Sequence, residues 1–310
     1  MGVLTARFLF RLAEGPPLLL DAAMGTELQR RDADTTLPLW SARPLLRDPE
    51  LVWTVHGDEV SAGADILTAN TFRTHARSLA KAALAERSGE LTARAVQLAH
   101  QAAAAPGREV FVAGSLSPLE DCYRPDLVPD DAALEREHGA QARFLAHAGV
   151  DLILAETHNT IREAVAALSA AKASGVPAIL SLVTDGEGRL LSGETIEDSA
   201  RALLPLAPDA LGINCVPAAR LAADLEQLAA AAPGLPLAAY GNLGLPADEK
   251  GWAFTEELSP EDYAEHAARW LALGARIVGG CCGTRAEHTR ALRKRLYAKA
   301  REAAGSEPAA

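Results

Sequence analysis

The chain has 310 residues, of which 49% are hydrophobic, and it carries 30 lysines and arginines against 41 aspartates and glutamates. A net charge of −11, with a single short basic block at 293–295, argues against a nucleic-acid partner. No run of 18 apolar residues and no secretory pattern is present, so we expect a cytoplasmic protein without a membrane partner. The length suits one large domain, since α/β barrels commonly use about 250 residues.

Short apolar runs alternate with helical patterns along most of the chain. We predict strands at 17–21, 64–70, 109–115, 149–157, 176–183, 211–217, 235–242 and from 277 into the cysteines at 281–282. Helices are predicted at 48–63, 76–105 with a break near 88–89, 130–148, 161–174, 195–206, 218–232, 260–273 and 286–300.

Eight strands alternating with eight helices predict an α/β fold, a single-domain (β/α)8 TIM barrel over residues 1–302. We expect the small, polar tail at 303–310 to be disordered. A doubly wound sheet is the alternative, but it would scatter the polar strand ends along an open edge. A barrel gathers them at one mouth, where we place Asp21, Asn70, Glu156, Cys215, Asn242, Cys281 and Cys282.

Two adjacent cysteines, Cys281 and Cys282, follow the last strand and are flanked by Gly280 and Gly283. If this strand and the strand ending in Cys215 are parallel neighbours, three thiolates meet, which is a zinc ligand set with an open fourth position. Buried free cysteines and a disulfide are the alternatives. Adjacent cysteines bridge only with strain, and the glycines allow both side chains to face one ion, so we favour zinc.

Other residues near the predicted mouth have more than one reading. Asp21 and Glu156 each end an apolar strand. A carboxylate at this place either binds a ligand or caps the N-terminus of the following helix. Cys122 is interpreted as a bystander near the mouth, and core packing is favoured for Trp40 and Trp252 over contact with a cationic ligand. The histidines His75, His158 and His288 are possible metal ligands in principle, but three cysteines already suffice. We expect these histidines to be solvated, as lone histidines in loops usually are.

Four motifs together resemble the zinc-dependent homocysteine S-methyltransferases, over about Leu18 to Arg295. They are Asp21 with 24–28, then 68–72, 212–215 and 279–284. The segments 39–42 and 192–195 look most like the short stand-alone members, which take the methyl group from a sulfonium donor. Two loops depart from the family pattern: Ala22-Ala23 replaces Asp-Gly, and 241–244 reads Gly-Asn-Leu-Gly.

The resemblance implies methyl transfer to L-homocysteine to give L-methionine, with zinc held by Cys215, Cys281 and Cys282 as the catalytic centre. It also implies that Asp21 and Glu156 hold the homocysteine ammonium group. Backbone amides after Asp21, at Ala23 and Met24, would meet the carboxylate. Apart from the resemblance, Asn70 and Asn242 are candidates to orient the substrate, with ordinary loop asparagines as the alternative. We expect S-methylmethionine as the best donor, S-adenosylmethionine as a slower one and betaine as a poor one.

Two further functions stay open at this stage. In the first, the barrel is a methyltransferase that takes its methyl group from a separate methyl-corrinoid protein. In the second, it is a zinc module that binds thiols without turnover of its own. A zinc hydrolase is disfavoured, because its ligands are usually histidines or carboxylates. The sequence also leaves open whether the protein is a homo-oligomer.

Overall fold

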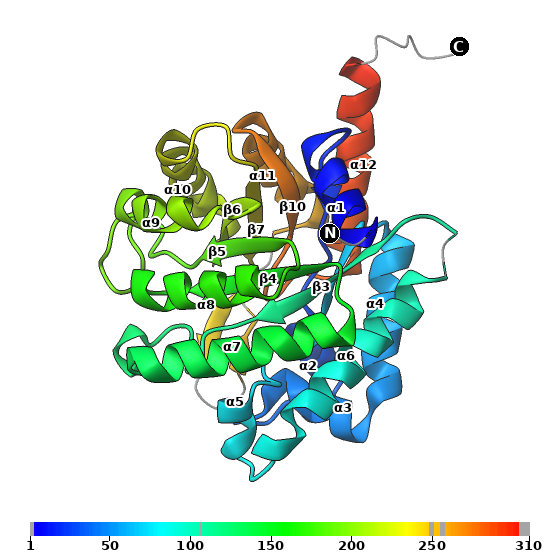
Figure 1. Cartoon of the computed structure of the whole chain (residues 1–310). Coiled ribbons are helices and arrows are strands. Elements are labelled where there is room, and N and C mark those ends of the chain that lie inside the picture. Colours follow the sequence, from blue (N-terminus) through cyan, green and yellow to red (C-terminus); the bar gives the residue numbers. More distant parts are fainter. Residues whose placement is uncertain (1–2, 106, 248–250, 255–257, 304–310) are drawn as a thin grey trace.

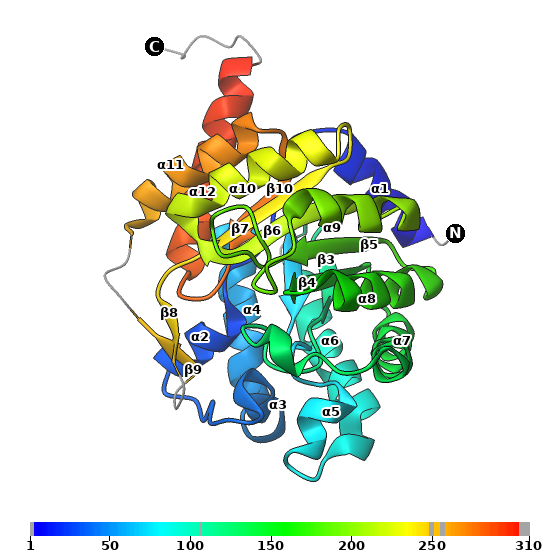
Figure 2. The same ribbon diagram turned by 90° about the vertical axis from the view of Figure 1, so that its left-hand side faces the viewer.

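The computed structural model describes residues 3–105, 107–247, 251–254 and 258–303. Eight parallel strands form a barrel with helices on the outside (Figures 1 and 2). They are β1 (Leu18–Leu19), β2 (Ile66–Ala69), β3 (Phe111–Leu116), β4 (Leu152–His158), β5 (Ala178–Leu182), β6 (Ala210–Pro217), β7 (Leu237–Asn242) and β10 (Ala275–Gly280). Each of the eight predicted strands is confirmed. The tail predicted to be disordered lies outside the described residues, except for Ala303.

The strand order β1-β10-β7-β6-β5-β4-β3-β2 brings the two ends of the sheet together. Leu20 pairs in parallel with Ile66 across that junction. The backbone N–H of Asp21 donates to the carbonyl of Ile66 at 3.0 Å, and that of Asp65 donates to Leu19 at 2.7 Å. The barrel is therefore nearly closed, and the predicted TIM barrel is confirmed.

The main helices cover the barrel as predicted, and several short elements were not predicted. The long helices that follow strands are α4 (Pro49–Ala62), α6 (Ser88–Ala103), α7 (Asp131–Ala148), α8 (Ile161–Ala173), α9 (Ile196–Leu203), α10 (Ala218–Ala231), α11 (Pro260–Ala272) and α12 (Ala286–Ala303). The helix predicted at 76–105 is present as α5 (Ala76–Ala80), the 3₁₀ turn 85–87 and α6, and its break falls before Ser88 and not at 88–89. The 3₁₀ turn 204–206 ends the helix predicted at 195–206. The additional elements are α1 (Val3–Ala13), α2 (Met24–Arg30), α3 (Arg43–Arg47), β8 (Leu245–Ala247), β9 (Gly251–Ala253) and the 3₁₀ turns 40–42 and 125–127.

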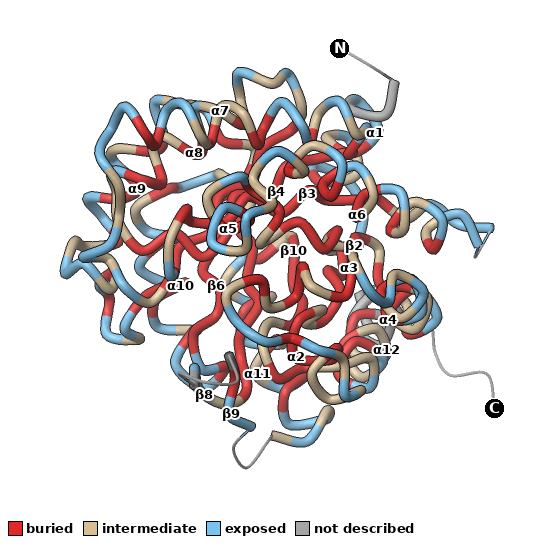
Figure 3. The backbone as a smooth tube through the Cα atoms, turned by 90° about the horizontal axis from the view of Figure 1, so that it is seen from below, coloured by how far each residue is buried: buried red, intermediate tan, exposed pale blue. Residues whose placement is uncertain are grey.

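Capping residues explain where the outer helices begin. The Asp48 side chain accepts a hydrogen bond from the Leu51 N–H at 3.2 Å, and Pro49 occupies the first turn of α4. Gly63 ends the helix at φ 108°, a backbone conformation that costs glycine little. The predicted start of this helix is confirmed. Figure 3 shows the result for the whole molecule, with buried strands inside and helices exposed along their outer faces.

Apolar side chains fill the barrel interior, and α1 closes one end of it. Phe8 and Leu12 of α1 pack in the same cluster as Leu18, Ile66 and Phe111 from the strands. The rings of Phe8 and Phe111 meet edge to face with centroids 5.3 Å apart. Because α1 precedes β1, it covers the amino ends of the strands and leaves the opposite mouth for polar groups (Figure 1).

Apart from α1, the elements that the sequence did not predict follow strands and lie at their carboxyl ends. Gln29 of α2 donates its side-chain amide to the carbonyl of Trp252 at 3.0 Å, so the β8–β9 hairpin lies against α2 (Figure 2). These segments wall the mouth of the barrel. Within the described part of the chain, none of the helices has the length and apolar character needed to cross a lipid bilayer.

Candidate active site

Three cysteine sulfurs meet at the mouth of the barrel. The Sγ atoms of Cys215, Cys281 and Cys282 all lie within 4.8 Å of one another, and those of Cys215 and Cys282 are 3.7 Å apart. Four sulfurs placed tetrahedrally at about 2.3 Å from a zinc ion would be separated by about 3.8 Å. The cluster therefore fits a metal ion with three thiolate ligands. Each residue is free of a disulfide.

The glycines around the cysteine pair are required by close packing. A Cβ atom on Gly280 would lie 2.1 Å from Oγ1 of Thr284. Gly283 has φ 85°, and its Cβ would meet the Leu243 carbonyl oxygen at 1.9 Å. Strand β10 ends at Gly280, so Cys281 and Cys282 belong to a turn and are not forced to opposite faces of a sheet. The break of the strand that was expected at these glycines is confirmed, whereas their role in presenting both cysteines to an ion stays a prediction.

The strands that carry the cysteines are not neighbours, contrary to the expectation from the sequence. Strand β7 lies between β6 and β10. The sulfurs still meet because β6 departs from regular pairing at its end, where Cys215 adopts φ 55° and the register with β7 shifts between Asn214 and Pro217. Asn242 at the end of β7 donates its side-chain amide to the Cys215 carbonyl at 2.9 Å. It fixes this bend and does not line the cavity.

The cysteines differ in acidity when no metal is bound. Hydrogen bonds from Cys281 and Cys282 lower the pKa of the Cys215 thiol, and the same contacts with Cys215 raise the pKa of Cys282. These contacts thus favour the thiolate form of Cys215 over that of Cys282. A bound metal ion would deprotonate all three thiols, because thiolates are its ligands.

Asp21 lies at the bottom of the mouth, just after β1, and is 3% exposed. Its carboxylate accepts hydrogen bonds from the Thr68 N–H and hydroxyl, both at 2.8 Å. Burial, followed by the negative charge of Glu59, raises its pKa well above the usual range. Asp21 caps no helix, since α2 begins after Ala23. A buried carboxylate of this kind favours a cationic ligand.

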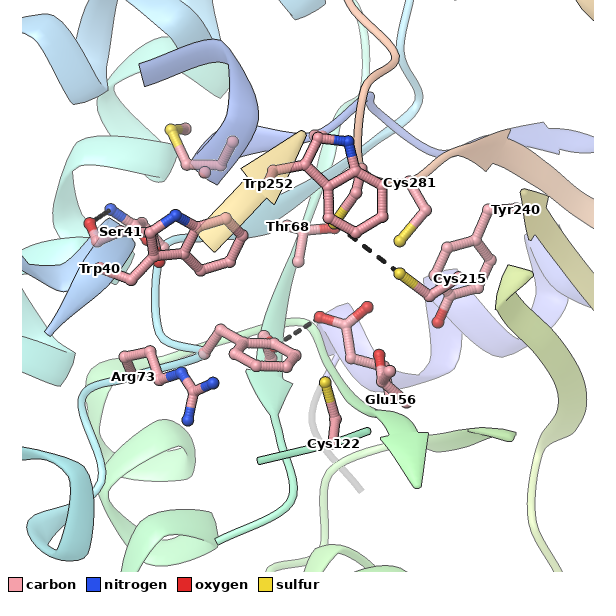
Figure 4. Close-up of a pocket in the computed structure, with 18 of the residues that line it drawn as sticks. Trp40, Ser41, Thr68, Arg73, Cys122, Glu156, Cys215, Tyr240, Trp252 and Cys281 are labelled. Atoms are coloured by element: carbon pink, nitrogen blue, oxygen red, sulfur yellow. Dashed lines mark hydrogen bonds between the residues drawn. The ribbon is translucent and has the colours of Figure 1, made fainter. Parts of the chain in front are cut away.

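Glu156 occupies the corresponding place at the end of β4. Ser115 donates a hydrogen bond to Oε1 of Glu156 at 2.5 Å. Burial, with a smaller contribution from the Cys215 charge, raises the pKa of Glu156 to about 7. Figure 4 shows its carboxylate in the same cavity as Cys215. Helix α8 is capped by Thr160, so the N-cap reading is wrong for Glu156 as well.

These groups line one cavity of ≈ 360 Å³ at the mouth of the barrel. Of the residues expected to contact the substrate, Asp21, Ala23, Met24, Asn70 and Glu156 all line it. Asn70 donates its side-chain amide to the Ser41 carbonyl at 2.7 Å, which ties the segment before α3 to the end of β2. The residues that the barrel was expected to gather therefore lie together at its mouth, and all of them except Asn242 line the cavity.

Both tryptophans for which core packing was favoured line the cavity as well. Trp40 lies in the segment between α2 and α3, and Trp252 comes from the β8–β9 hairpin (Figure 4). The ring N–H of Trp252 donates to the Leu243 carbonyl at 2.9 Å, whereas the ring nitrogen of Trp40 has no hydrogen-bond partner. Their indole rings give the cavity an aromatic wall that the sequence pattern did not distinguish from core.

Tyr123 is a cavity residue that the sequence analysis missed. Its hydroxyl lies 3.1 Å from Sγ of Cys215. It belongs to the connection between β3 and α7, where Cys122 also lines the cavity, as expected for a bystander at the mouth. Burial raises the pKa of the Cys122 thiol, which keeps it protonated. A tyrosine beside a proline-rich loop carries no sequence pattern that would assign it to a metal site.

The histidines expected to be solvated are buried. His75 lies 2.9 Å from the Ser78 hydroxyl through Nε2, and His158 lies 3.2 Å from the Leu116 carbonyl through its own Nε2. His288 is 1% exposed. Each of the three has a ring nitrogen in a polar contact with a neighbouring group, and none belongs to the cysteine cluster.

Known proteins share both the sequence and the fold of this chain. The profile of the homocysteine S-methyltransferase family matches residues 18–296. The homocysteine S-methyltransferase of Escherichia coli (strain K12) is 35% identical, over 90% of this chain and 94% of that protein. The selenocysteine Se-methyltransferase of Brassica oleracea var. italica is 29% identical, over 91% of this chain and 89% of that protein.

Solved structures lead to the same group of proteins. The metallated form of the homocysteine methyltransferase MmuM from Escherichia coli is 31% identical, with a TM-score of 0.78 over 94% of this chain and 99% of that chain. Sequence and fold therefore agree over nearly the whole length. The chain belongs to the homocysteine S-methyltransferase family.

Proposed function

We propose that this protein transfers a methyl group from a small sulfonium compound to the thiol of L-homocysteine, giving L-methionine, and that its cofactor is zinc. The observation that carries the proposal is the set of three cysteine sulfurs within 4.8 Å, set in a cavity that also holds two buried carboxylates. Three thiolates leave one position of a tetrahedral ion open for a substrate sulfur. Soft sulfur ligands favour zinc over the hard cations that carboxylates select.

In this proposal Cys215, Cys281 and Cys282 hold the ion. A thiol with a pKa of about 8.5 is only a few per cent ionised at pH 7, and binding to zinc would supply homocysteine sulfur as the thiolate. Gly280 and Gly283 place Cys281 and Cys282, and Asn242 places Cys215. The thiol proton passes to solvent through the open mouth.

Asp21 and Glu156 orient homocysteine in this scheme by holding its ammonium group. Both carboxylates line the cavity, and burial raises the pKa of each because the ionised form loses contact with water. An ammonium group would supply a counter-ion and favour both ionised forms. In the same scheme the backbone amides of Ala23 and Met24, which line the cavity at the start of α2, bind the carboxylate of homocysteine.

A sulfonium donor suits the charge of the site. The thiolate sulfur supplies the electron pair of the new sulfur–carbon bond, and the old bond leaves its pair on the donor sulfur, which becomes neutral. Attack therefore cancels charge and requires no acid. The residues of the chain need only align the two sulfurs and exclude water. Trp40 and Trp252, in the cavity wall, offer ring faces to the positive sulfur.

The deciding assay supplies the isolated, zinc-loaded protein with homocysteine and one donor at a time, and measures methionine. We expect S-methylmethionine to be the best donor, S-adenosylmethionine slower and betaine poor. Activity only after addition of a methyl-corrinoid protein would replace the sulfonium donor with a carrier. Tight homocysteine binding without turnover from any donor would identify a thiol-binding module instead.

A further inference from the structure

Arg73 places a positive charge in a cavity whose other charged groups are mostly acidic. It follows β2 and lines the cavity together with the acids Asp21, Asp121 and Glu156. Its guanidinium carbon lies 5.4 Å from the centroid of the Phe72 ring. The remaining polar contact is a long one, 3.5 Å from Nη1 to the Glu120 carbonyl.

The hydrogen-bonding capacity of Arg73 is largely unused. Its Nε atom is buried and has no hydrogen-bond partner, and no ion pair joins Arg73 to a carboxylate within the described residues. Arg124, the other cation among the described lining residues, differs in both respects. It is exposed and forms two hydrogen bonds with Asp126, at 2.8 and 2.7 Å. A half-buried guanidinium with free donors is suited to a planar anion such as a carboxylate.

The position of Arg73 indicates which substrate would bring that anion. Figure 4 shows Arg73 on one side of the cavity, with Cys215 and Cys281 on the other. A donor whose methyl group faces the cysteine cluster must extend away from it, toward the side that Arg73 occupies. The acids and thiolates of the cavity attract a sulfonium centre, but they repel a carboxylate on the same molecule. A cation remote from the cysteines removes this conflict.

On the basis of the proposed function, we infer that Arg73 binds the carboxylate of the methyl donor. The donor class is then a sulfonium that carries a carboxylate, such as a sulfonium amino acid. Sulfonium compounds without an acidic group would lack this contact. Arg73 would be a specificity-determining residue, separate from the groups that hold homocysteine.

Paired donors test this assignment on the zinc-loaded enzyme. S-methylmethionine is compared with its carboxamide, which keeps the sulfonium and the ammonium group but has no carboxylate. We expect Arg73→Gln to raise KM for S-methylmethionine about 10- to 100-fold and to leave KM for the carboxamide unchanged. Arg73→Lys should recover part of the loss, because it restores charge without the bidentate geometry. KM for homocysteine and zinc content should match the wild type.

Three results would overturn the inference. They are an equal loss for both donors, a rise confined to KM for homocysteine, and a carboxylate-specific loss in Arg124→Gln but not in Arg73→Gln. Calorimetric titration of S-methylmethionine into the same proteins measures donor binding without turnover. Absence of binding to the wild-type protein would also overturn the inference. Wild-type protein that binds S-methylmethionine through Arg73 but forms no methionine would instead refute the proposed function.

Discussion

The Tyr123 hydroxyl lies 3.1 Å from the sulfur of Cys215, so a loop between β3 and α7 contacts the cysteine cluster directly. Buried side chains hold this loop in place. Asn159 donates to the Cys122 carbonyl at 2.9 Å, and the Leu119 N–H donates to Glu163 at 2.8 Å. The hydroxyl is therefore positioned by the fold to donate a hydrogen bond to a Cys215 thiolate.

Removing the hydroxyl tests this contact. We expect Tyr123→Phe to keep the fold but to weaken zinc binding about 10- to 100-fold, as loss of an outer-shell hydrogen bond to a metal ligand typically does. Competition with a chromogenic chelator measures the affinity. A competition curve identical to that of the wild type would show that the hydroxyl does not support the ligand.

The cysteine cluster predicts that replacing any of its three members has a different result from replacing Cys122. Serine in place of Cys215, Cys281 or Cys282 removes one of three soft ligands and should abolish both bound zinc and activity. Cys122→Ser is the matched control, because Cys122 lines the same cavity but lies outside the cluster. Elemental analysis should give about one zinc per chain for the control. Full zinc occupancy in Cys281→Ser would falsify the ligand assignment.

The two cavity carboxylates should act on substrate and not on metal. Asp21→Asn and Glu156→Gln remove a charge that faces the homocysteine ammonium group in the proposed scheme. A lost pairing of this kind costs about 2 to 5 kcal/mol, or roughly 30- to 5000-fold in Kd. Calorimetry with homocysteine measures the loss, and elemental analysis should show normal zinc. Unchanged affinity in both variants would move the ammonium site elsewhere.

Much of the fold and of the site could be predicted because strands buried on both faces give apolar runs, and polar residues at their ends stand out. Asp21, Glu156 and the three cysteines were recognised in this way. The element α1 was missed, since its closing of the barrel depends on tertiary contacts such as Phe8 with Phe111. The hairpin that brings Trp252 to the cavity was missed for the same reason.

Two further errors have physical causes. We expected Cys215 and Cys281 on neighbouring strands because the bend at the end of β6 was not foreseen. The bend depends on the φ of 55° at Cys215, and a pattern of apolar residues does not reveal a backbone angle. The histidines were expected in solvent because lone histidines in loops usually are. His158 instead ends β4 and packs against the outer helix α7, where its ring meets that of His138 edge to face with centroids 5.7 Å apart.

A buried glutamate on α4 predicts an unusual dependence of stability on pH. Burial raises the pKa of Glu59 from 4.5 to about 7. The folded protein thus holds this proton more tightly than the unfolded chain does. The associated stability is present below pH 4.5 and is lost as the pH rises through 7. At pH 8 the ionised form costs at most about 3 kcal/mol.

Glu59→Gln should remove this cost. One oxygen of Glu59 accepts both from the Ala22 N–H and from the Thr289 hydroxyl, and the amide oxygen of glutamine can take both bonds. We expect the variant to gain unfolding free energy over the wild type at pH 8 and little at pH 4.5. Denaturant unfolding of chelator-treated protein measures it. Glu50→Gln, at the exposed start of the same helix, serves as the control, and a gain that is equal at both pH values would contradict the prediction.

The aromatic wall formed by Trp40 and Trp252 predicts that replacing Trp40 weakens binding of the methyl donor but not of homocysteine. Trp40 lines the cavity, and a Cβ on Gly25 would lie 2.7 Å from its ring, so the indole is held tightly in place. A sulfonium over such a ring gains about 0.5 to 2 kcal/mol, so Trp40→Leu should raise KM for the donor about 2- to 30-fold. Trp40→Phe should be milder, because the wild-type ring N–H has no partner to lose. Trp53→Leu, with a side chain that is 47% exposed, is the matched control. Initial rates at saturating homocysteine measure the effect, and a KM that rises for homocysteine but not for the donor would assign Trp40 to the acceptor side.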